Sequence, residues 1–341
     1  MDEDKSKYAG YWIRRFLEEY LVTVRNFSIN TRDSYRDMFR LMLPHISEKA
    51  NTSIDLLLIQ DMTPHRIQSF LSGVEEIRNC CVKTRNLRLS AIYAFAKYVA
   101  LDCPEHVEWC RNVHKIPLKK SGQSLITYLE KEEMDAFLEA PDRNTKQGWR
   151  DYILMLFLYN TGARADEVAS LTVNDILIPT SKNKEMAMVT IKGKGSKMRR
   201  CPLWNKTAEE LKILIRNREM SDALFLNRLG QPITRFGIYE MVTRYAKVVE
   251  QRLPSIKNKR VSPHTIRHTT ATHLLQAGVD INTIRAWLGH ESINTTNIYA
   301  EVNMKMKVEA LKCCEIVEEK PEKRIPWKND EKLMDFLDNL K

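Results

Sequence analysis

One segment of the sequence combines a histidine, an arginine and the start of a helix. Ser262 and Pro263 suit the N-cap and the first position of a helix, so His264 is expected in its opening turn. Arg267 lies three residues further on and therefore shares a helix face with His264. The unpaired backbone N–H groups of a helix start favour an anion nearby, and a guanidinium binds phosphate through paired hydrogen bonds. These features together predict a site for a phosphate group.

The same segment has two other interpretations. His264 and His268 stand four residues apart and could hold zinc. However, no glutamate base lies between them, and Arg267 would oppose a cation. Either histidine could instead satisfy a polar group in the core. The seven cysteines contain no CxxC pair and indicate neither a zinc knuckle nor a redox motif, so the sequence predicts no metal.

Other residues have side chains that could act on the same phosphate. Arg164 lies at an expected break between two helices, and Glu167 follows three residues later. Lys194 stands between two glycines, which permit a tight turn and close approach of the backbone to a ligand. His290 is followed nine residues later by Tyr299. Each signal is weak by itself, because lysine–glycine turns are common on surfaces and tyrosines near helix ends usually pack.

The composition indicates what kind of protein holds these residues. The chain has 341 residues and a net charge of +10, which favours a polyanionic partner. Charge alone does not distinguish nucleic acid from an acidic membrane, but the basic residues are clustered, which favours nucleic acid. No apolar run is long enough to span a membrane. The charged N-terminus lacks the apolar core of a secretory signal, so we expect a cytoplasmic protein.

Helical periodicity predicts that the chain is all helical up to about residue 115. The first helix carries apolar residues between positions 12 and 21, the second is capped by Asn30 or Thr31, and the third begins near Thr63. The fourth begins near Val82, and its apolar positions are Leu87, Leu89, Ile92, Phe95 and Val99. A basic stretch with proline and glycine, residues 116–123, has no periodicity and predicts a linker. We therefore expect a helical domain at residues 1–115.

Residues 124–341 are expected to form a second domain of mixed structure. Helices are predicted at 130–138, 149–159 and 166–171, and further helices extend to about residue 317. Two strands, 187–191 and 198–203, enclose the glycine-rich turn that carries Lys194. The predicted fold class is mainly α with a small β-sheet, as a helical domain plus a mixed α+β domain.

Two of the expected helices begin with basic and hydroxyl side chains, and the linker is also basic. Such a run is often only a solvated face. It also suits a surface that places Arg and Lys on DNA phosphates and other side chains on base edges. The sequence leaves both interpretations open for the candidates, which are Arg32, Arg36, Lys83, Thr84, Arg85, Arg88, Lys119 and Lys120.

The motifs, in their order along the chain, resemble those of the tyrosine recombinase (phage integrase) family. The first arginine box of the family is matched by Thr161-Gly162-x-Arg164-x-x-Glu167 and its hairpin lysine by Gly193-Lys194-Gly195. Its second arginine box is matched by His264-x-x-Arg267-His268, its third box by Leu288-Gly289-His290 and its nucleophile by Ile298-Tyr299-Ala300. The resemblance covers residues 124–303 well. Residues 1–115 resemble the family's helical, SAM-like core-binding domain more loosely. We therefore expect no arm-binding domain before them, as in Xer-like and transposon-type members. None of the six catalytic positions departs from the family pattern.

The resemblance implies a DNA strand transferase that needs neither metal nor ATP. Tyr299 would attack the scissile phosphate, leaving a 3′-phosphotyrosyl link and a free 5′-hydroxyl, and a second transesterification would rejoin the strands. Lys194 would act as general acid, His264 would share proton handling, and Arg164, Arg267 and His290 would stabilise the phosphorane. Glu167 and His268 would support these side chains. No cofactor is implied.

The resemblance also implies partners. They are a double-stranded DNA recombination site and further copies of the chain, with a dimer on each site and a homotetramer on two sites, associated with the nucleoid and not with a membrane. The apolar face of the last helix, about residues 326–341, either packs on its own domain or docks on a neighbouring protomer. Two rival functions remain: a type IB topoisomerase that relaxes supercoils, and a DNA-binding protein that has lost activity.

Overall fold

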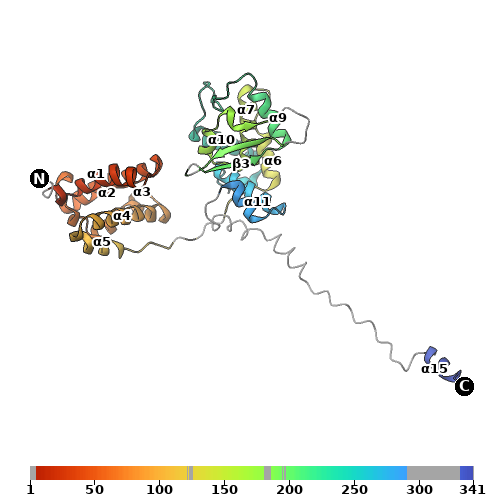
Figure 1. The fold of residues 1–341 in the computed structure, drawn as a ribbon, viewed down its shortest axis with the longest axis horizontal. Coiled ribbons are helices and arrows are strands. Elements are labelled where there is room, and N and C mark those ends of the chain that lie inside the picture. Colours follow the sequence, from red (N-terminus) through yellow and green to blue (C-terminus); the bar gives the residue numbers. More distant parts are fainter. Residues whose placement is uncertain are drawn as a thin grey trace. The chain divides into compact units, whose positions relative to one another are not determined.

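The computed structural model describes residues 5–120, 122, 126–179, 186–193, 195, 197–289 and 331–340. Contacts divide the chain into two compact units, residues 1–124 and 125–341. Figure 1 shows the helices of the first unit gathered into one bundle. Within the described ranges, no helix has both the length and the apolar character needed to cross a membrane.

The first unit consists of helices around one apolar core. Its main helices are α1 (Ala9–Arg15), which continues into the π-helix η2 (Phe16–Val24), then α2 (Ile29–Ala50), α3 (Pro64–Arg78), α4 (Val82–Asp102) and α5 (Val107–His114). Aromatic rings form the centre of the core, where the ring centroids of Phe39 and Phe95 are 5.0 Å apart and those of Phe16 and Phe95 are 5.4 Å apart. The expected all-helical character of this segment is confirmed.

The first unit differs from the predictions in the cap of α2 and in one additional helix, α5. The cap of α2 is Ser28, not Asn30 or Thr31, because its hydroxyl oxygen accepts a hydrogen bond from the backbone N–H of Thr31 at 3.4 Å. Leu87 is 65% exposed, whereas Leu89 is buried. Residues two apart on a helix lie about 200° apart around its axis, so they cannot share the buried face. Helix α5 was not predicted.

The second unit packs helices around α7 (Lys146–Thr161), which is buried along most of its length. The other helices in the same fold are α6 (Lys131–Glu139), α8 (Ala165–Ala169), α9 (Asn205–Leu214), α10 (Arg235–Arg252), α11 (Pro263–Gln276) and α12 (Ile281–Leu288). Helix α15 (Glu331–Asp338) lies within the predicted last helix. The apolar side chains on it, and one that follows it, are all exposed: Leu333, Met334, Phe336, Leu337 and Leu340.

The described residues of this unit contain one small antiparallel sheet in the order β1-β2-β3. The predicted hairpin is present as β2 (Met188–Lys192) and β3 (Met198–Pro202), whereas the short strand β1 (Ile176–Leu177) was not predicted. Ile191 pairs with Arg199, and the N–H of Gly193 donates to the carbonyl of Lys197 at 2.8 Å, which closes the turn. The predicted fold class, mainly α with a small β-sheet, is confirmed.

Candidate active site

Arg164 is placed by the junction between α7 and α8. Gly162 ends α7 at φ +60°, a conformation that favours glycine. A Cβ atom at Gly162 would lie only 2.5 Å from Leu288, so this glycine also allows the end of α12 to approach closely. Arg164 follows as the N-cap of α8, with a side chain that is 38% exposed. Its backbone N–H and its Nη1 both donate to Glu167, at 2.9 and 2.8 Å.

His264 and Arg267 are placed by the start of α11, which has the predicted cap. The hydroxyl oxygen of Ser262 accepts a hydrogen bond from the N–H of Thr265 at 3.3 Å, and Pro263 occupies the first turn. Arg267 is 1% exposed. Its Nη1 donates to the carbonyl of Gly162 at 2.7 Å and its Nη2 to that of Leu288 at 2.6 Å. Arg267 therefore connects the ends of α7 and α12.

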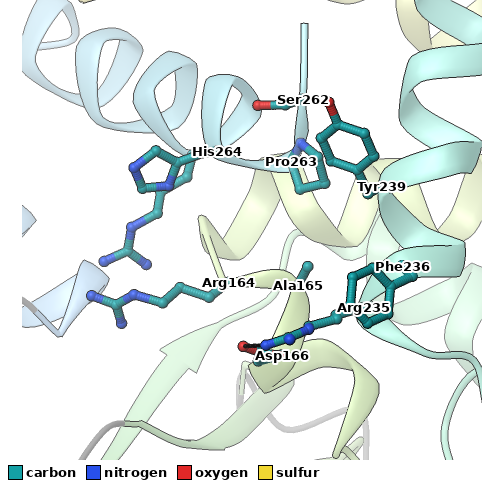
Figure 2. A pocket seen from close by; sticks show the side chains of 10 residues that line it. Arg164, Ala165, Asp166, Arg235, Phe236, Tyr239, Ser262, Pro263 and His264 are labelled. Atoms are coloured by element: carbon teal, nitrogen blue, oxygen red, sulfur yellow. Dashed lines mark hydrogen bonds and ion pairs between the residues drawn. The ribbon is translucent and has the colours of Figure 1, made fainter. Parts of the chain in front are cut away.

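The segment that carries Arg164 and the segment that carries His264 and Arg267 meet at one cavity, although about 100 residues separate them in the sequence. The cavity has a volume of about 460 Å³ and is lined by Arg164, His264, Arg267 and side chains of α10. Figure 2 shows Arg164 and His264 on one side of this cavity, with Phe236 and Tyr239 on the other. Arg164, Arg235 and Arg267 all line this cavity, and guanidinium groups favour an anionic ligand such as a phosphate.

The histidines beside these arginines are neutral at pH 7. Desolvation lowers the pKa of His264, and the positive charges of Arg267 and Arg164 lower it further. Burial lowers the pKa of His268 to about 4, with added effects of His264 and Arg267. The two rings are in edge-to-face contact, with centroids 4.5 Å apart. A neutral imidazole can donate one hydrogen bond and accept another, which suits contact with a tyrosine hydroxyl or a phosphate.

The pKa of His268 predicts a pH dependence of stability. The unfolded chain takes up a proton near pH 6.5, whereas the folded protein resists protonation of His268 until about pH 4. The contribution of the neutral ring to stability is therefore complete above pH 6.5 and decreases as the pH falls toward 4. We expect the free energy of unfolding, measured with urea and monitored by tryptophan fluorescence, to fall less between pH 6.5 and 4 in His268→Gln than in the native protein. An equal dependence on pH in the two proteins would contradict the lowered pKa of His268.

Glu167 contacts two arginines, one of which was not expected from the sequence. It is 6% exposed and pairs with Arg164 from its own helix and with Arg199 from β3. Burial by itself would raise the pKa of Glu167. The hydrogen bonds and the charge of Arg199, followed by the hydrogen bonds of Arg164, hold this pKa below its ordinary value. The sequence does hold a signal for Arg199, because it stands two residues before Cys201 in a predicted strand and therefore shares the strand face of that apolar residue. A charged side chain on the inward face of a strand requires a partner.

Three of the predicted catalytic residues, Lys194, His290 and Tyr299, lie outside the described residues. Described glycines precede two of them in the sequence. A Cβ atom at Gly193 would lie 3.4 Å from Arg199 and 3.5 Å from Glu167. Gly289 caps α12 at φ +66°, and a Cβ atom there would lie 3.2 Å from Arg199. The residues preceding Lys194 and His290 are thus both placed next to Arg199. Among the described side chains, no three His, Cys, Asp or Glu residues are grouped as metal ligands.

The predicted DNA contacts of the first unit have different surroundings. Thr84 and Arg88 of α4 line one groove with Thr31 and Ser34 of α2, so these two helix starts face the same groove, whose volume is about 550 Å³. Thr84, Arg88 and Arg32 are partly buried, whereas Lys83 and Lys120 are exposed. Arg36 is exposed and pairs with Asp33 and Asp37, and Lys119 is exposed and pairs with Glu75. The prediction that Arg85 contacts DNA is wrong, because its side chain is buried (5% exposed) and donates to the carbonyl of Pro117 at 2.8 Å. It holds the chain after α5 and is not a surface contact.

Comparison with known proteins identifies the family of this chain. The sequence profile of the phage integrase family matches residues 127–306. The integrase/recombinase y4rC of Sinorhizobium fredii is 34% identical over 330 residues, covering 96% of this chain and 97% of that protein. The tyrosine recombinase XerD of Staphylococcus haemolyticus is 30% identical, covering 84% of this chain and 94% of its own.

Solved structures show the same fold at lower sequence identity. The Tn1549 transposon integrase in complex with transposon right end DNA has a TM-score of 0.67 at 18% identity and covers 89% of this chain and 99% of its own. The XerH site-specific recombinase bound to its difH substrate has a TM-score of 0.63 at 23% identity and covers 88% of this chain and 84% of its own.

The fold is that of the tyrosine recombinases, and Arg164, His264 and Arg267 line one cavity within it. This chain belongs to the phage integrase family and is a site-specific tyrosine recombinase, an enzyme that binds DNA and cuts and rejoins its strands.

Proposed function

We propose that Tyr299 is the nucleophile of this recombinase and that Arg164, Lys194, His264, Arg267 and His290 act on the scissile phosphate. The observation that carries the proposal is the meeting of Arg164, His264 and Arg267 at one cavity. Gly193 and Gly289, which precede Lys194 and His290, both lie next to Arg199, and this supports the inclusion of Lys194 and His290. Tyr299 is included on its sequence motif.

The proposed reaction begins with attack of the Tyr299 oxygen on phosphorus. The phosphorus–5′-oxygen bond breaks, a 3′-phosphotyrosyl link forms, and the 5′-oxygen receives a proton from Lys194. A free tyrosine has a pKa near 10, so it needs help to lose its proton at pH 7. The neutral imidazole of His264 would share the proton of the Tyr299 hydroxyl. Arg164, Arg267 and His290 would donate hydrogen bonds to the nonbridging oxygens as their negative charge increases. Attack by a 5′-hydroxyl of the partner strand reverses these steps, so neither ATP nor a metal is required.

We propose that the first unit and the chain after it hold DNA through the exposed basic side chains, and Arg85 is removed from that set. The groove between the starts of α2 and α4 would face the DNA, with Arg88 on phosphate and Thr84 beside it. The assignments of residues 1–115 as a core-binding domain, 116–123 as a basic linker and 124–341 as the catalytic domain belong to this proposal. So does the location of the enzyme on chromosomal DNA in the cytoplasm.

The test of this function requires a DNA site, which can be selected from duplexes with a randomised central segment. The selected sequence, carrying a nick beside the cleavage point, should trap a covalent complex with the native protein. Exchange of strands between two copies of the site is the expected outcome, and relaxation of supercoiled DNA without sequence preference would instead assign a topoisomerase. We further propose a role in transposition, which predicts that the selected sequence occurs at the ends of the mobile element that carries the gene.

We also propose that four copies assemble on two sites and that α15 docks on a neighbouring copy. The support is the exposure of its whole apolar face, including Phe336 at 62% and Leu337 at 52%. Removal of residues 326–341 should weaken the pairing of two sites in a gel-shift assay while cleavage of a single site continues. Leu337→Asp should reproduce this effect, and Asp335→Asn, on the same helix, should not. Normal pairing by the truncated protein would exclude this role of α15.

A further inference from the structure

Arg199 is a buried cation that the proposed chemistry does not use. It lies on β3, and its side chain is 9% exposed. Its Nη2 donates to Oε2 of Glu167 at 2.6 Å and its Nη1 to Oε1 at 3.2 Å, so the two groups are paired in fork geometry. Its Nε donates to the carbonyl of Trp287 at 3.0 Å. A guanidinium with this much burial and this many fixed hydrogen bonds is held in one position.

The first consequence concerns the end of α12. The last carbonyls of a helix have no partner within the helix and carry partial negative charge. Arg199 donates to the carbonyl of Trp287, and Arg267 donates to that of the next residue, Leu288. Two arginines from different elements therefore hold the end of α12, one residue before Gly289. Arg199 contributes directly to the position of a helix end that Arg267 also contacts.

The second consequence concerns the charge on Glu167. The side chain of Arg164 reaches Glu167 through Nη1, at 2.8 Å from Oε1. The other oxygen, Oε2, accepts from Nη2 of Arg199 and from the backbone N–H of Arg164. A buried carboxylate requires a cation, and the loss of one partner leaves an uncompensated charge. Without Arg199, the side chain of Arg164 would be the nearest cation, and Glu167 would draw it away from the cavity.

We propose that Arg199 is a positioning residue for DNA cleavage, which balances Glu167 so that Arg164 remains directed at the phosphate and which holds the end of α12 beside Arg267. This inference rests on the proposed function of Arg164 and Arg267. Arg199 touches neither the cavity nor, in this proposal, the DNA. Its effect is therefore expected on the rate of cleavage and not on affinity for DNA.

The test compares Arg199→Met with Arg200→Met, which changes the neighbouring, exposed residue of the same strand. The single-turnover rate of covalent complex formation is measured at saturating protein on the nicked, selected site. Affinity is measured for each variant combined with Tyr299→Phe. Arg199→Met should lower the rate about 10²-fold, the effect of a displacement of about 1 Å, with little change in affinity. Arg200→Met should retain the native rate once DNA is saturated.

A double variant tests the charge argument. If Arg199 acts by balancing Glu167, removal of the carboxylate charge in Glu167→Gln should relieve part of the defect. The double variant should then lose less activity than the product of the two single losses. Arg199→Lys keeps the charge but cannot hold both Glu167 and the Trp287 carbonyl, so its rate should fall between those of Arg199→Met and the native protein. It also serves as the test if Arg199→Met fails to fold.

The possible failures are distinguishable. If the native protein forms no covalent complex that depends on Tyr299, the proposed function is wrong. If the native protein forms this complex and Arg199→Met forms it at the native rate, only the role of Arg199 is wrong. Multiplicative losses in the double variant, or a loss confined to DNA affinity, would also overturn it.

Discussion

Tyr299→Phe is expected to abolish the covalent protein–DNA complex and to leave DNA binding intact. The substitution removes one oxygen, which is the only protein atom that the proposed mechanism joins to phosphorus. The ring remains, and the arginines at the cavity keep their charge at any working pH, so the phosphate should still be bound. The measurement is a denaturing gel of the nicked selected site after incubation with protein, together with a gel shift for affinity.

The matched control for this variant is a second tyrosine. Tyr239 lines the same cavity from α10 and is 41% exposed, so Tyr239→Phe removes a hydroxyl close to the proposed phosphate position. It should continue to form the covalent complex. A native level of covalent complex with Tyr299→Phe would mean that another group attacks phosphorus. Loss of the complex in Tyr239→Phe would then identify Tyr239 as that group.

Arg267→Lys is expected to slow covalent complex formation by roughly 10²–10³-fold, the usual effect of removing one preorganised donor to a developing oxyanion. The charge is retained, so this loss comes from geometry. A guanidinium has five N–H donors in a planar fork, whereas an ammonium group donates from a single nitrogen. Lysine cannot reach the carbonyls of Gly162 and Leu288 together, as Arg267 does at 2.7 and 2.6 Å, and also donate to a phosphate.

Arg150→Lys is the control for the general cost of altering an arginine that is largely covered by the protein. The Arg150 side chain is 14% exposed, donates to the carbonyl of Leu226 at 2.8 Å and pairs with Asp151, but does not line the cavity. Both variants should lose some thermal stability, and only Arg267→Lys should lose cleavage at saturating DNA. An equal loss of cleavage in the two variants would show that the effect of Arg267 is structural.

Much of the local structure was predictable because its signals act within a few residues. The cap of Ser262 on Thr265 and the first-turn position of Pro263 are contacts between near neighbours in the sequence. The same holds for the hairpin of β2 and β3, where the register follows from a short glycine-containing turn.

The sequence by itself therefore determined the residue types of the site and the helix starts that carry Arg164, His264 and Arg267. Only the tertiary structure decided which arginines are buried and what each one contacts. Arg85 holds a carbonyl in the first unit, Arg199 pairs with Glu167, and Arg267 joins Gly162 to Leu288, across 105 and 21 residues. An arginine on a helix or strand has the same local preferences whether it faces solvent, a carboxylate or a helix end. Its partners are set by the packing of elements that are distant in the sequence, which no local pattern contains.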